Sequence, residues 1–305
     1  MKIIYGINKI KKFKKPVVAL GVFDGVHRGH RRILNAAVSK ARQIGGQSVA
    51  LTFWPHPQRE ESLYSLEHRL RLFTELGIDL CVVINFSSYF AGIKAESFIK
   101  NFLVDKLGVA HVYVGRDFRF GNKAGGDLGL LERLGKVYGF KAKGFNIVHI
   151  NGLPITSTLI RSLIKKGKIK EAQNLLQRPV SILGTVKRGA RLGRILGYPT
   201  ANINPQHEVI PACGIYAVRI ILDKNKFKGV CYIGRRPTVS PRRVESRQNK
   251  INIEVHIFNF NKNIYAKFIE IQFVQRIRLD KKFPSLALLA KQIEKDVISA
   301  KKILS

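Results

Sequence analysis

The chain has 305 residues, of which 45% are hydrophobic and 24% are charged. This length and composition exclude an intrinsically disordered chain and allow two domains with separate cores. No apolar stretch approaches the roughly 20 residues of a membrane-spanning helix, and lysines interrupt the first fifteen residues too often for a secretory signal. We therefore expect a soluble, cytoplasmic protein with no membrane partner.

The formal net charge of +34 is typical of proteins that bind nucleic acid. However, the 54 Lys and Arg residues are spread almost evenly, with 30 in residues 1–180 and 24 in residues 181–305. A basic run stands out only at residues 9–15. We therefore expect no specific nucleic acid partner, and the positive surface should attract small anionic molecules over a long range.

The three cysteines, Cys81, Cys213 and Cys231, are odd in number and far apart in the sequence. They lie among apolar residues, as in Leu-Cys-Val-Val at 80–83. This pattern predicts reduced, buried thiols that pack as small hydrophobic side chains.

The apolar run 17–20 is followed directly by residues 21–30, Gly-Val-Phe-Asp-Gly-Val-His-Arg-Gly-His. The run predicts a buried strand, and Gly21 and Gly25 permit a tight turn or a close approach of the backbone to a ligand. Apolar residues at helical spacing predict a helix over 31–43. The free N–H groups of that helix start would lie beside His27 and His30, whose imidazoles can donate to anionic oxygens. This pattern is typical of a phosphate-binding turn.

Two other interpretations of this histidine pair stay open. The histidines could be metal ligands, although a zinc site normally uses four ligands and no cysteine is near in sequence. They could also be ordinary surface residues at the start of a helix.

Further apolar runs at 48–53, 80–84 and 111–115 alternate with helix-like segments. This alternation predicts βαβ units and a parallel sheet that binds its ligand outside the carboxyl ends of the strands. Phe53, Phe118 and Phe120 lie at those ends, where a ring could stack on a flat aromatic ligand or simply join the core.

Residues 155–161, Ile-Thr-Ser-Thr-Leu-Ile-Arg, open another segment with helical spacing. Hydroxyl groups at a helix start can cap the helix or bind a phosphate. Arg161, one turn further on, can bind phosphate oxygens through two hydrogen bonds. Simple capping and phosphate binding both remain open.

Beyond residue 180, strand-like runs predominate and are separated by Gly, Pro, Asn and Asp turns. We predict strands over 180–186, 214–222, 227–233, 251–260 and 264–274. Five or six strands with little helix between them predict an antiparallel barrel. A final helix carries apolar residues at steps of three and four, which predicts core packing for Leu286, Leu289, Ile293 and Val297.

Residues 184–202 hold a second candidate for nucleotide binding. Gly184 and Gly189 have the spacing of a P-loop, but Ala-Arg follows where Lys-Ser/Thr is required, so this is not a Walker A motif. The Pro-Thr-Ala-Asn sequence at 199–202 would by itself be a plain β-turn. On the strand predicted downstream, Glu254 alternates with its apolar neighbours, which places its carboxylate on the opposite face.

These motifs occur together, and in this order, in one family. Residues 21–30 resemble the HxGH motif of the nucleotidylyltransferase superfamily, and with Phe-Asp-Gly they resemble the FMN adenylyltransferase half of bacterial bifunctional riboflavin kinase/FAD synthetases. Residues 184–202 resemble the riboflavin kinase half. Other similar elements are found at 52–57, 114–121, 155–161, 214–217, 233–238, 253–256 and 278–283.

The resemblance implies a two-domain protein. An N-terminal α/β, Rossmann-like nucleotidylyltransferase domain with a parallel sheet would span 1–180. A C-terminal riboflavin kinase domain, an antiparallel β-barrel with a terminal helix, would span 181–305.

The resemblance also implies the chemistry. Riboflavin and ATP would give FMN, and FMN with a second ATP would give FAD and pyrophosphate, with Mg²⁺ as cofactor. The catalytic residues implied are His27, His30 and Arg161 for adenylyl transfer and Glu254 as the general base for phosphorylation. The implied nucleotide-binding residues are Gly21, Phe23, Asp24, Gly25, Gly29, Ser157, Thr158, Gly184, Gly189, Thr200 and Asn202, with Thr200 and Asn202 also holding the metal. The implied flavin-binding residues are Phe53, Pro55, His56, Pro57, Asp117, Phe118 and Phe120.

Three residues depart from the family pattern: Trp54 stands in place of an acidic residue, Asn259 in place of Asp and Ala266 in place of Gly. Two alternatives therefore stay open, a basic nucleic-acid-binding protein on a retained fold and an enzyme with one active module. The sequence leaves the oligomeric state open, between a monomer and transient self-association.

Overall fold

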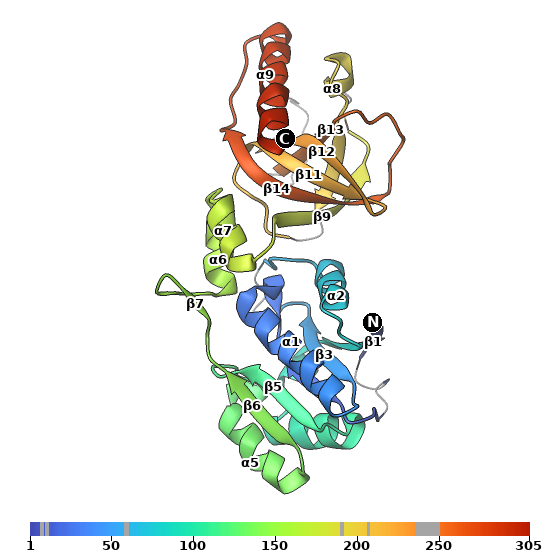
Figure 1. Cartoon of the computed structure of the whole chain (residues 1–305), viewed down its shortest axis with the longest axis vertical. Helices are drawn as coiled ribbons and strands as arrows, with labels where there is room; N and C mark the ends of the chain where they lie inside the picture. Colours follow the sequence, from blue (N-terminus) through green and yellow to red (C-terminus); the bar gives the residue numbers. More distant parts are fainter. Residues whose placement is uncertain (7–8, 10–11, 58–60, 190–191, 206–207, 236–250) are drawn as a thin grey trace. The chain divides into compact units, whose positions relative to one another are not determined.

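A computed structural model describes residues 1–6, 9, 12–57, 61–189, 192–205, 208–235 and 251–305 (Figure 1). The chain divides into two compact units, Met1–Ser157 and Thr158–Ser305. The domain boundary between residues 180 and 181 stays a prediction. Residues 10–11 of the basic run, 190–191 of the glycine segment and 236–238 of a family element lie outside the described residues.

The first unit contains the predicted parallel sheet, with six strands in the order β1-β4-β3-β2-β5-β6. Successive residues of β2 alternate between two hydrophobic clusters, so both faces of the sheet are covered by a core. The strands are β1 (Lys2–Tyr5), β2 (Val17–Leu20), β3 (Ser48–Trp54), β4 (Leu80–Asn85), β5 (His111–Gly115) and β6 (Lys141–Phe145).

Helices connect these strands. They are α1 (Arg28–Gln43), α2 (Leu66–Glu75), α3 (Ser88–Ala91), α4 (Ala95–Phe98), a π-helical segment (Ile99–Leu107) and α5 (Leu128–Tyr138), with single 3-10 turns at Asp24–Val26 and Asn122–Ala124. A small hairpin of β7 (His149–Ile150) and β8 (Leu153–Pro154) follows. Helix α1 begins three residues before the predicted 31–43 because the side chain of His27 caps it.

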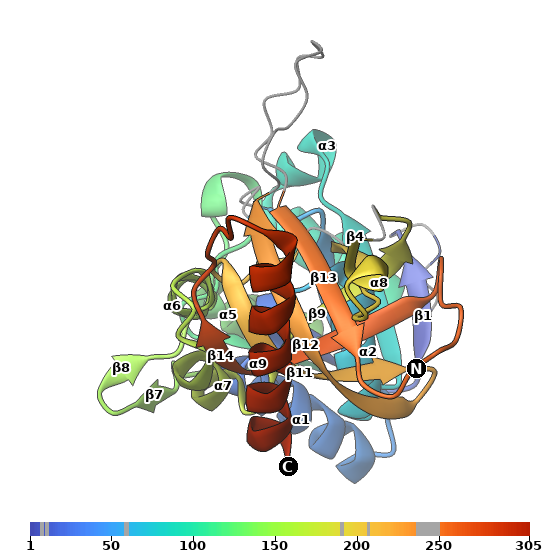
Figure 2. The ribbon, with the colours of Figure 1, turned by 90° about the horizontal axis from the view of Figure 1, so that it is seen from above.

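In the second unit, six described strands form a closed barrel in the order β10-β13-β12-β11-β14-β9. All pairings between these strands are antiparallel, which confirms the predicted barrel. Helix α6 (Ser157–Lys165) belongs to this unit except for its first residue, Ser157, which belongs to the first unit. The other elements are α7 (Ile169–Leu176), β9 (Val180–Lys187), α8 (Leu192–Ile195), β10 (Ala201–Pro205), β11 (Gly214–Leu222), β12 (Asn225–Arg235), β13 (Ile251–Ile257), β14 (Phe268–Arg278) and α9 (Leu286–Leu304). Figure 2 shows α9 lying along the barrel wall, where it packs on β11, β12 and β14.

The predicted strand boundaries after residue 250 were partly wrong. β13 ends at Ile257 rather than at residue 260, and β14 begins at Phe268 rather than at residue 264. Asn259 and Ala266 have positive φ values of 53° and 61°, so the chain leaves the extended conformation on both sides of a loop. Strand β10 was not predicted, and it begins at Ala201, within the expected turn at 199–202.

Two packing predictions need correction. Leu286 at the start of α9 is 55% exposed, while Val297 further along is buried as predicted, so only the later part of the apolar stripe enters the core. Cys81 and Cys231 are buried and Cys213 is half-buried, and all three thiols are free. Burial raises the pKa of the Cys81 thiol to about 12, which makes this group unreactive near neutral pH.

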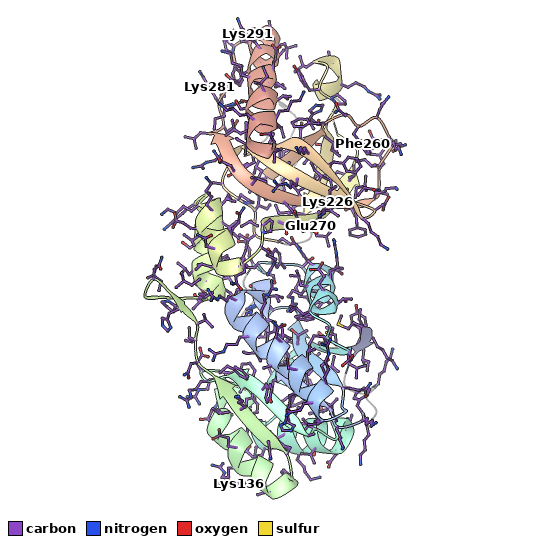
Figure 3. The ribbon with its side chains drawn as sticks, in the orientation of Figure 1. Lys136, Lys226, Phe260, Glu270, Lys281 and Lys291 are labelled. Atoms are coloured by element: carbon purple, nitrogen blue, oxygen red, sulfur yellow. The ribbon has the colours of Figure 1, made fainter. Side chains whose placement is uncertain are left out.

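The basic charge lies on the surfaces of both units. Lys136 in the first unit and Lys226, Lys281 and Lys291 in the second are exposed (Figure 3). This distribution agrees with the even spread of lysine and arginine along the sequence. Within the described residues, none of the helices has the length and apolar character needed to span a membrane.

Candidate active sites

The first candidate site is the turn between β2 and α1. Its backbone takes left-handed conformations at Phe23 (φ 52°), Gly25 (φ 80°) and Val26 (φ 40°). Gly25 has no room for a side chain, because a Cβ there would lie 2.5 Å from Cδ1 of Leu63. A non-glycine residue such as Val26 adopts positive φ at a cost, so the surrounding packing must hold the turn in place.

Asp24 is part of that support. Its carboxylate is buried, and Oδ1 accepts hydrogen bonds from the backbone N–H groups of Leu63 at 2.8 Å and Tyr64 at 3.4 Å. Its backbone carbonyl accepts a hydrogen bond from the Ser157 hydroxyl at 2.8 Å. The turn is thus joined to the segment before α2 and to the first residue of α6. These contacts give Asp24 a positioning role, and direct nucleotide binding by Asp24 stays a prediction.

The two histidines lie together at the start of α1. Nδ1 of His27 accepts the backbone N–H of His30 at 3.4 Å, and the two rings stack with 3.6 Å between centroids. Phe23 packs edge-on against His30. Because Nδ1 of His27 is an acceptor, a neutral His27 ring carries its proton on Nε2, which can donate to an anionic oxygen. Between the histidines, a Cβ on Gly29 would lie 3.2 Å from the His27 ring, so a side chain there would press on the stacked pair.

The predicted flavin-side residues have different exposures. Phe53 and Phe120 are buried at 5% and 8% and pack against other phenylalanines, so these two rings belong to the core. Phe118 is half-buried and stacks on Phe120 at 6.0 Å, while Asp117 is exposed. After β3, Pro55 is exposed and the side chains of His56 and Pro57 are half-buried. Phe118 is therefore the predicted ring best placed to meet a flat ligand.

The segment that begins α6 is partly buried. Thr158 is exposed and Arg161, one turn later, is 9% exposed. Both residues belong to the second compact unit, and their predicted contacts with a nucleotide stay predictions.

The second candidate site centres on Glu254 of β13. The strand register pairs Glu254 with Asn202 of β10 and with Tyr232 of β12. The Thr200 hydroxyl donates to Oε2 of Glu254 at 3.2 Å, and Nδ2 of Asn252 donates to Oε1 at 2.5 Å. These two donors fix the orientation of the carboxylate. Its neighbours on β13 are buried, which confirms the predicted alternation along the strand.

Asn202 lies beside this carboxylate and is 5% exposed. Its side-chain oxygen Oδ1 is buried, and among the described residues no group hydrogen-bonds to it. The glycine segment passes closely over the same side chain, since a Cβ on Gly189 would lie 2.1 Å from Nδ2 of Asn202. A buried oxygen without a donor is an expected feature of a site that receives a cation.

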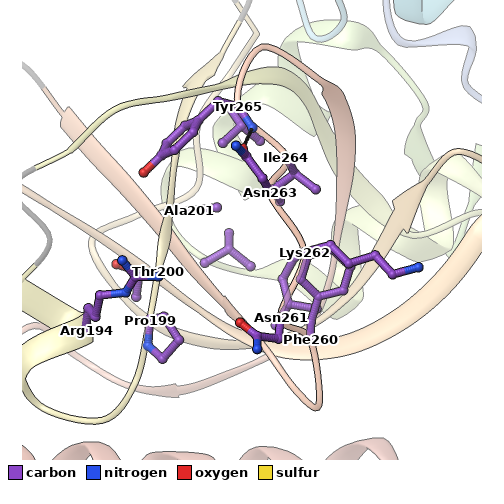
Figure 4. A pocket seen from close by; sticks show the side chains of 13 residues that line it. Arg194, Pro199, Thr200, Ala201, Phe260, Asn261, Lys262, Asn263, Ile264 and Tyr265 are labelled. Atoms are coloured by element: carbon purple, nitrogen blue, oxygen red, sulfur yellow. Dashed lines mark hydrogen bonds between the residues drawn. The ribbon is translucent and has the colours of Figure 1, made fainter.

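A cavity of about 470 Å³ adjoins Thr200 (Figure 4). Its apolar wall comes from the barrel strands, and the aromatic residues Phe260 and Tyr265 come from the loop between β13 and β14. The lining residues are Val186, Arg194, Pro199, Thr200, Ala201, Val255, Ile257, Phe260, Asn261, Lys262, Asn263, Ile264 and Tyr265. A cavity lined by both apolar and polar side chains suits a flat heteroaromatic ring joined to a polar group.

The structure places Gly184 in a strand, and its nucleotide-binding role stays a prediction. Gly184 is buried within β9 and pairs with Pro205 and Ile269, rather than lying in a phosphate-covering loop. A Cβ at this position would meet Cγ2 of Ile203 at 2.6 Å and the carbonyl oxygen of Asn204 at 2.7 Å. The glycine is required because the neighbouring strand approaches closely.

Comparison with known proteins finds a separate family for each half of the chain. Residues 9–159 match the FAD synthetase family and residues 176–304 match the riboflavin kinase family. The chain is 36% identical to the bifunctional riboflavin kinase/FMN adenylyltransferase of Buchnera aphidicola subsp. Schizaphis graminum, over 99% of this chain and 98% of that protein. The corresponding Escherichia coli K12 protein is 34% identical over 99% and 97%.

This chain belongs to the bifunctional riboflavin kinase/FMN adenylyltransferase family. A crystal structure from Streptococcus pneumoniae, described as that of a macrolide-efflux protein, has a similar fold, with a TM-score of 0.83 and 28% identity over 97% of each chain. The family resemblance and the two-part fold predicted from the sequence are confirmed.

Several residues of this family member were not predicted from its sequence. Arg69 of α2 is 1% exposed and hydrogen-bonds to both the β2 turn and the end of β3. Its spacing from Leu66 and Phe73 places it on the buried stripe of a helix, and this spacing is the sequence signal for its burial. Asn252 and the cavity loop were also missed, because their proximity to Glu254 and Thr200 depends on strand register and on a turn between strands.

Proposed function

We propose that this chain catalyses both steps from riboflavin to FAD. The second unit phosphorylates riboflavin with ATP to give FMN, and the first unit transfers the adenylyl group of a second ATP to FMN with release of pyrophosphate. The observation that carries the proposal is the presence, in one chain, of a stacked histidine pair at a helix start and of the Thr200–Glu254 hydrogen bond beside a cavity. Bifunctional relatives that match 99% of the chain support it.

For riboflavin phosphorylation, Glu254 is the general base that takes the proton of the ribityl 5′-hydroxyl as this oxygen attacks the γ-phosphorus of ATP. The hydrogen bonds from Thr200 and Asn252 orient its two oxygens for that proton. The cavity next to Thr200 accommodates a flat ring of one of the two substrates. Because phosphoryl transfer depends mainly on positioning and charge, the protein needs no covalent intermediate.

The residues of this site fit Mg²⁺. The Thr200 hydroxyl and the orphaned Oδ1 of Asn202 are the oxygen ligands that this hard cation prefers. These two residues would hold the ion, which when bound neutralises charge on the ATP phosphates. The Glu254 carboxylate is close to Thr200 and stays available for the substrate proton.

For adenylyl transfer, the N–H groups at the start of α1 and the two histidines bind the ATP phosphates. An FMN phosphate oxygen then attacks the α-phosphorus, a new P–O–P bond forms, and the bond to pyrophosphate breaks. Charge that develops on the transferred phosphoryl group is stabilised by donors held in place before the reaction. Phosphate contacts of Ser157, Thr158 and Arg161 stay predictions, and the Ser157 hydroxyl already donates its proton to the Asp24 carbonyl.

A labelled assay tests both steps. The purified chain is incubated with riboflavin, Mg²⁺ and ATP labelled in either the α- or the γ-phosphate, and flavins are separated by chromatography over time. We expect label from the γ-phosphate in FMN first and then in FAD, and label from the α-phosphate in FAD alone. A chain that forms FMN but no FAD, or FAD only from added FMN, would have one active module, and a chain that forms neither would contradict the proposal.

A further inference from the structure

Arg69 of α2 connects two parts of the first candidate site. One nitrogen of its guanidinium, Nη1, donates to the carbonyl oxygen of Val22 at 2.6 Å and to the Thr52 hydroxyl at 3.2 Å. The other, Nη2, donates to the carbonyl oxygen of Phe53 at 3.2 Å. The Thr52 hydroxyl itself donates to the Val22 carbonyl at 2.8 Å. A single side chain therefore contacts the turn after β2 and the last residues of β3.

These two parts carry different portions of the predicted site. Val22 precedes the turn that leads to the stacked histidines, and Phe53 precedes the segment Trp54 to Pro57 on the predicted flavin side. Neighbouring parallel strands β2 and β3 pair only as far as Leu20 and Leu51, so the sheet ladder does not extend to these loops. Helix α2 also packs against the 3-10 turn Asp24–Val26. Arg69 continues the connection between the two strands beyond the point where their ladder ends.

The guanidinium is held without an ion pair in the described part of the chain. It is 1% exposed, its Nε has no hydrogen-bond partner there, and its Cζ lies 5.3 Å from the Trp54 ring centroid. Burial lowers the pKa of Arg69, with the charge of Asp24 opposing this effect, yet arginine stays protonated in proteins. A buried cation is costly unless polar or aromatic groups compensate it. Here two carbonyl oxygens, a hydroxyl and the indole face provide that compensation.

We infer that Arg69 is a positioning residue for adenylyl transfer: it holds the histidine turn at a fixed distance from the flavin-side loop. The Trp54 ring is its counter-group, that is, the aromatic face that stabilises its positive charge. This inference rests on the proposed FMN adenylyltransferase activity. Lysine cannot replace the arginine, because one ammonium group lacks the planar fork that reaches Val22 and Phe53 together. Small displacements between reacting groups reduce turnover strongly even when each ligand still binds.

The test compares Arg69→Lys and Arg69→Met with Arg71→Lys, an exposed arginine on the same helix. FAD formation from FMN and ATP is measured as separate kcat and KM values, with FMN formation from riboflavin as an internal control. Circular dichroism reports the folded fraction and normalises kcat, because the Trp54 ring contacts Arg69 and its fluorescence would change with the substitution itself. We expect kcat for FAD to fall at least ten-fold in Arg69→Lys and further in Arg69→Met, with both KM values within three-fold and FMN formation unchanged.

A purely structural role would give a different result. In that case the folded fraction would decrease, while kcat per folded first unit would stay at the wild-type value in Arg69→Lys, and this outcome would overturn the inference. A wild-type chain that forms no FAD would reject the proposed function, and the inference with it. Loss of activity in Arg71→Lys equal to that in Arg69→Lys would also overturn it.

Trp54 is tested separately. Trp54→Phe keeps an aromatic face over the guanidinium and should retain kcat for FAD within three-fold, whereas Trp54→Leu removes that face and should lower kcat about ten-fold. Circular dichroism is again the folding control for these variants. Equal activity of the two variants would reject the role of the indole as a counter-group.

Discussion

The two candidate sites of this chain are built in different ways. In the first unit, one continuous segment from Gly21 to His30 supplies the strand end, the turn and the helix start. In the second unit, the group around Glu254 comes from separate strands, since Asn202 and Tyr232 reach it through the barrel register. A site on one segment depends on local backbone conformation, whereas a site across strands depends on the pairing of the whole barrel. Substitutions in the two units should therefore have separable effects on the two reactions.

The largest effect should come from Glu254→Gln. The amide cannot take the substrate proton, so kcat for riboflavin phosphorylation should fall by about 10²- to 10⁴-fold, the contribution typical of a general base. FAD formation from added FMN should stay at the wild-type rate. Chromatographic assays of each half-reaction measure both values, and Glu294→Gln, an exposed glutamate on α9, is the control. Retention of kinase activity in Glu254→Gln would exclude the glutamate as the base.

His30→Ala should have the opposite selectivity. It removes the proposed phosphate donor and the ring that stacks on His27, so FAD formation should fall by about 10²- to 10³-fold, as for loss of a preorganised donor. FMN formation by the second unit should not change. His149→Ala, on the exposed hairpin strand β7, serves as the matched control. A variant in which both reactions stop, although the protein is folded, would contradict the assignment of two separate sites.

Gly189→Ala should give a smaller, selective defect in the kinase. The added methyl group would lie 2.1 Å from Nδ2 of Asn202, so Asn202 or the loop must move. We expect the KM for ATP with Mg²⁺ to rise about ten-fold or kcat to fall similarly, an effect of about 1.4 kcal/mol. The control is Gly129→Ala on α5, where the new Cβ makes an ordinary contact. Unchanged kinase kinetics would show that Asn202 tolerates displacement.

The smallest expected effect concerns stability. Ala266 has a φ of 61°, which costs an L-residue about 1–2 kcal/mol, while glycine loses about 0.5–1 kcal/mol through the greater freedom of the unfolded chain. Ala266→Gly should therefore stabilise the second unit by up to about 1.5 kcal/mol, seen as a higher Tm or denaturation midpoint. Ala217→Gly, at a buried strand position, should destabilise it. A lower Tm for Ala266→Gly would show that the loop conformation differs from the one described.

Much of the fold followed from local sequence patterns. The buried face of α1, the parallel strands of the first unit and the alternation around Glu254 were predicted because side-chain period and burial are coupled in helices and strands. Errors occurred where local pattern conflicted with backbone geometry. Apolar residues continue from 264 into β14, but positive φ at Ala266 places them in a loop that lines the cavity.

The sequence by itself determined which residues are predicted to carry the chemistry: the histidine turn, the Pro-Thr-Ala-Asn segment and Glu254, each recognisable within a short stretch. Only the tertiary structure decided which side chains support them. Arg69 reaches Val22 from 47 positions away, and Thr200 reaches Glu254 across 54. It also decided that Gly184 is a packing residue and that Phe53 and Phe120 belong to the core. Long-range contacts depend on how strands pair and how helices pack. The spacing of residues within a single segment does not indicate them.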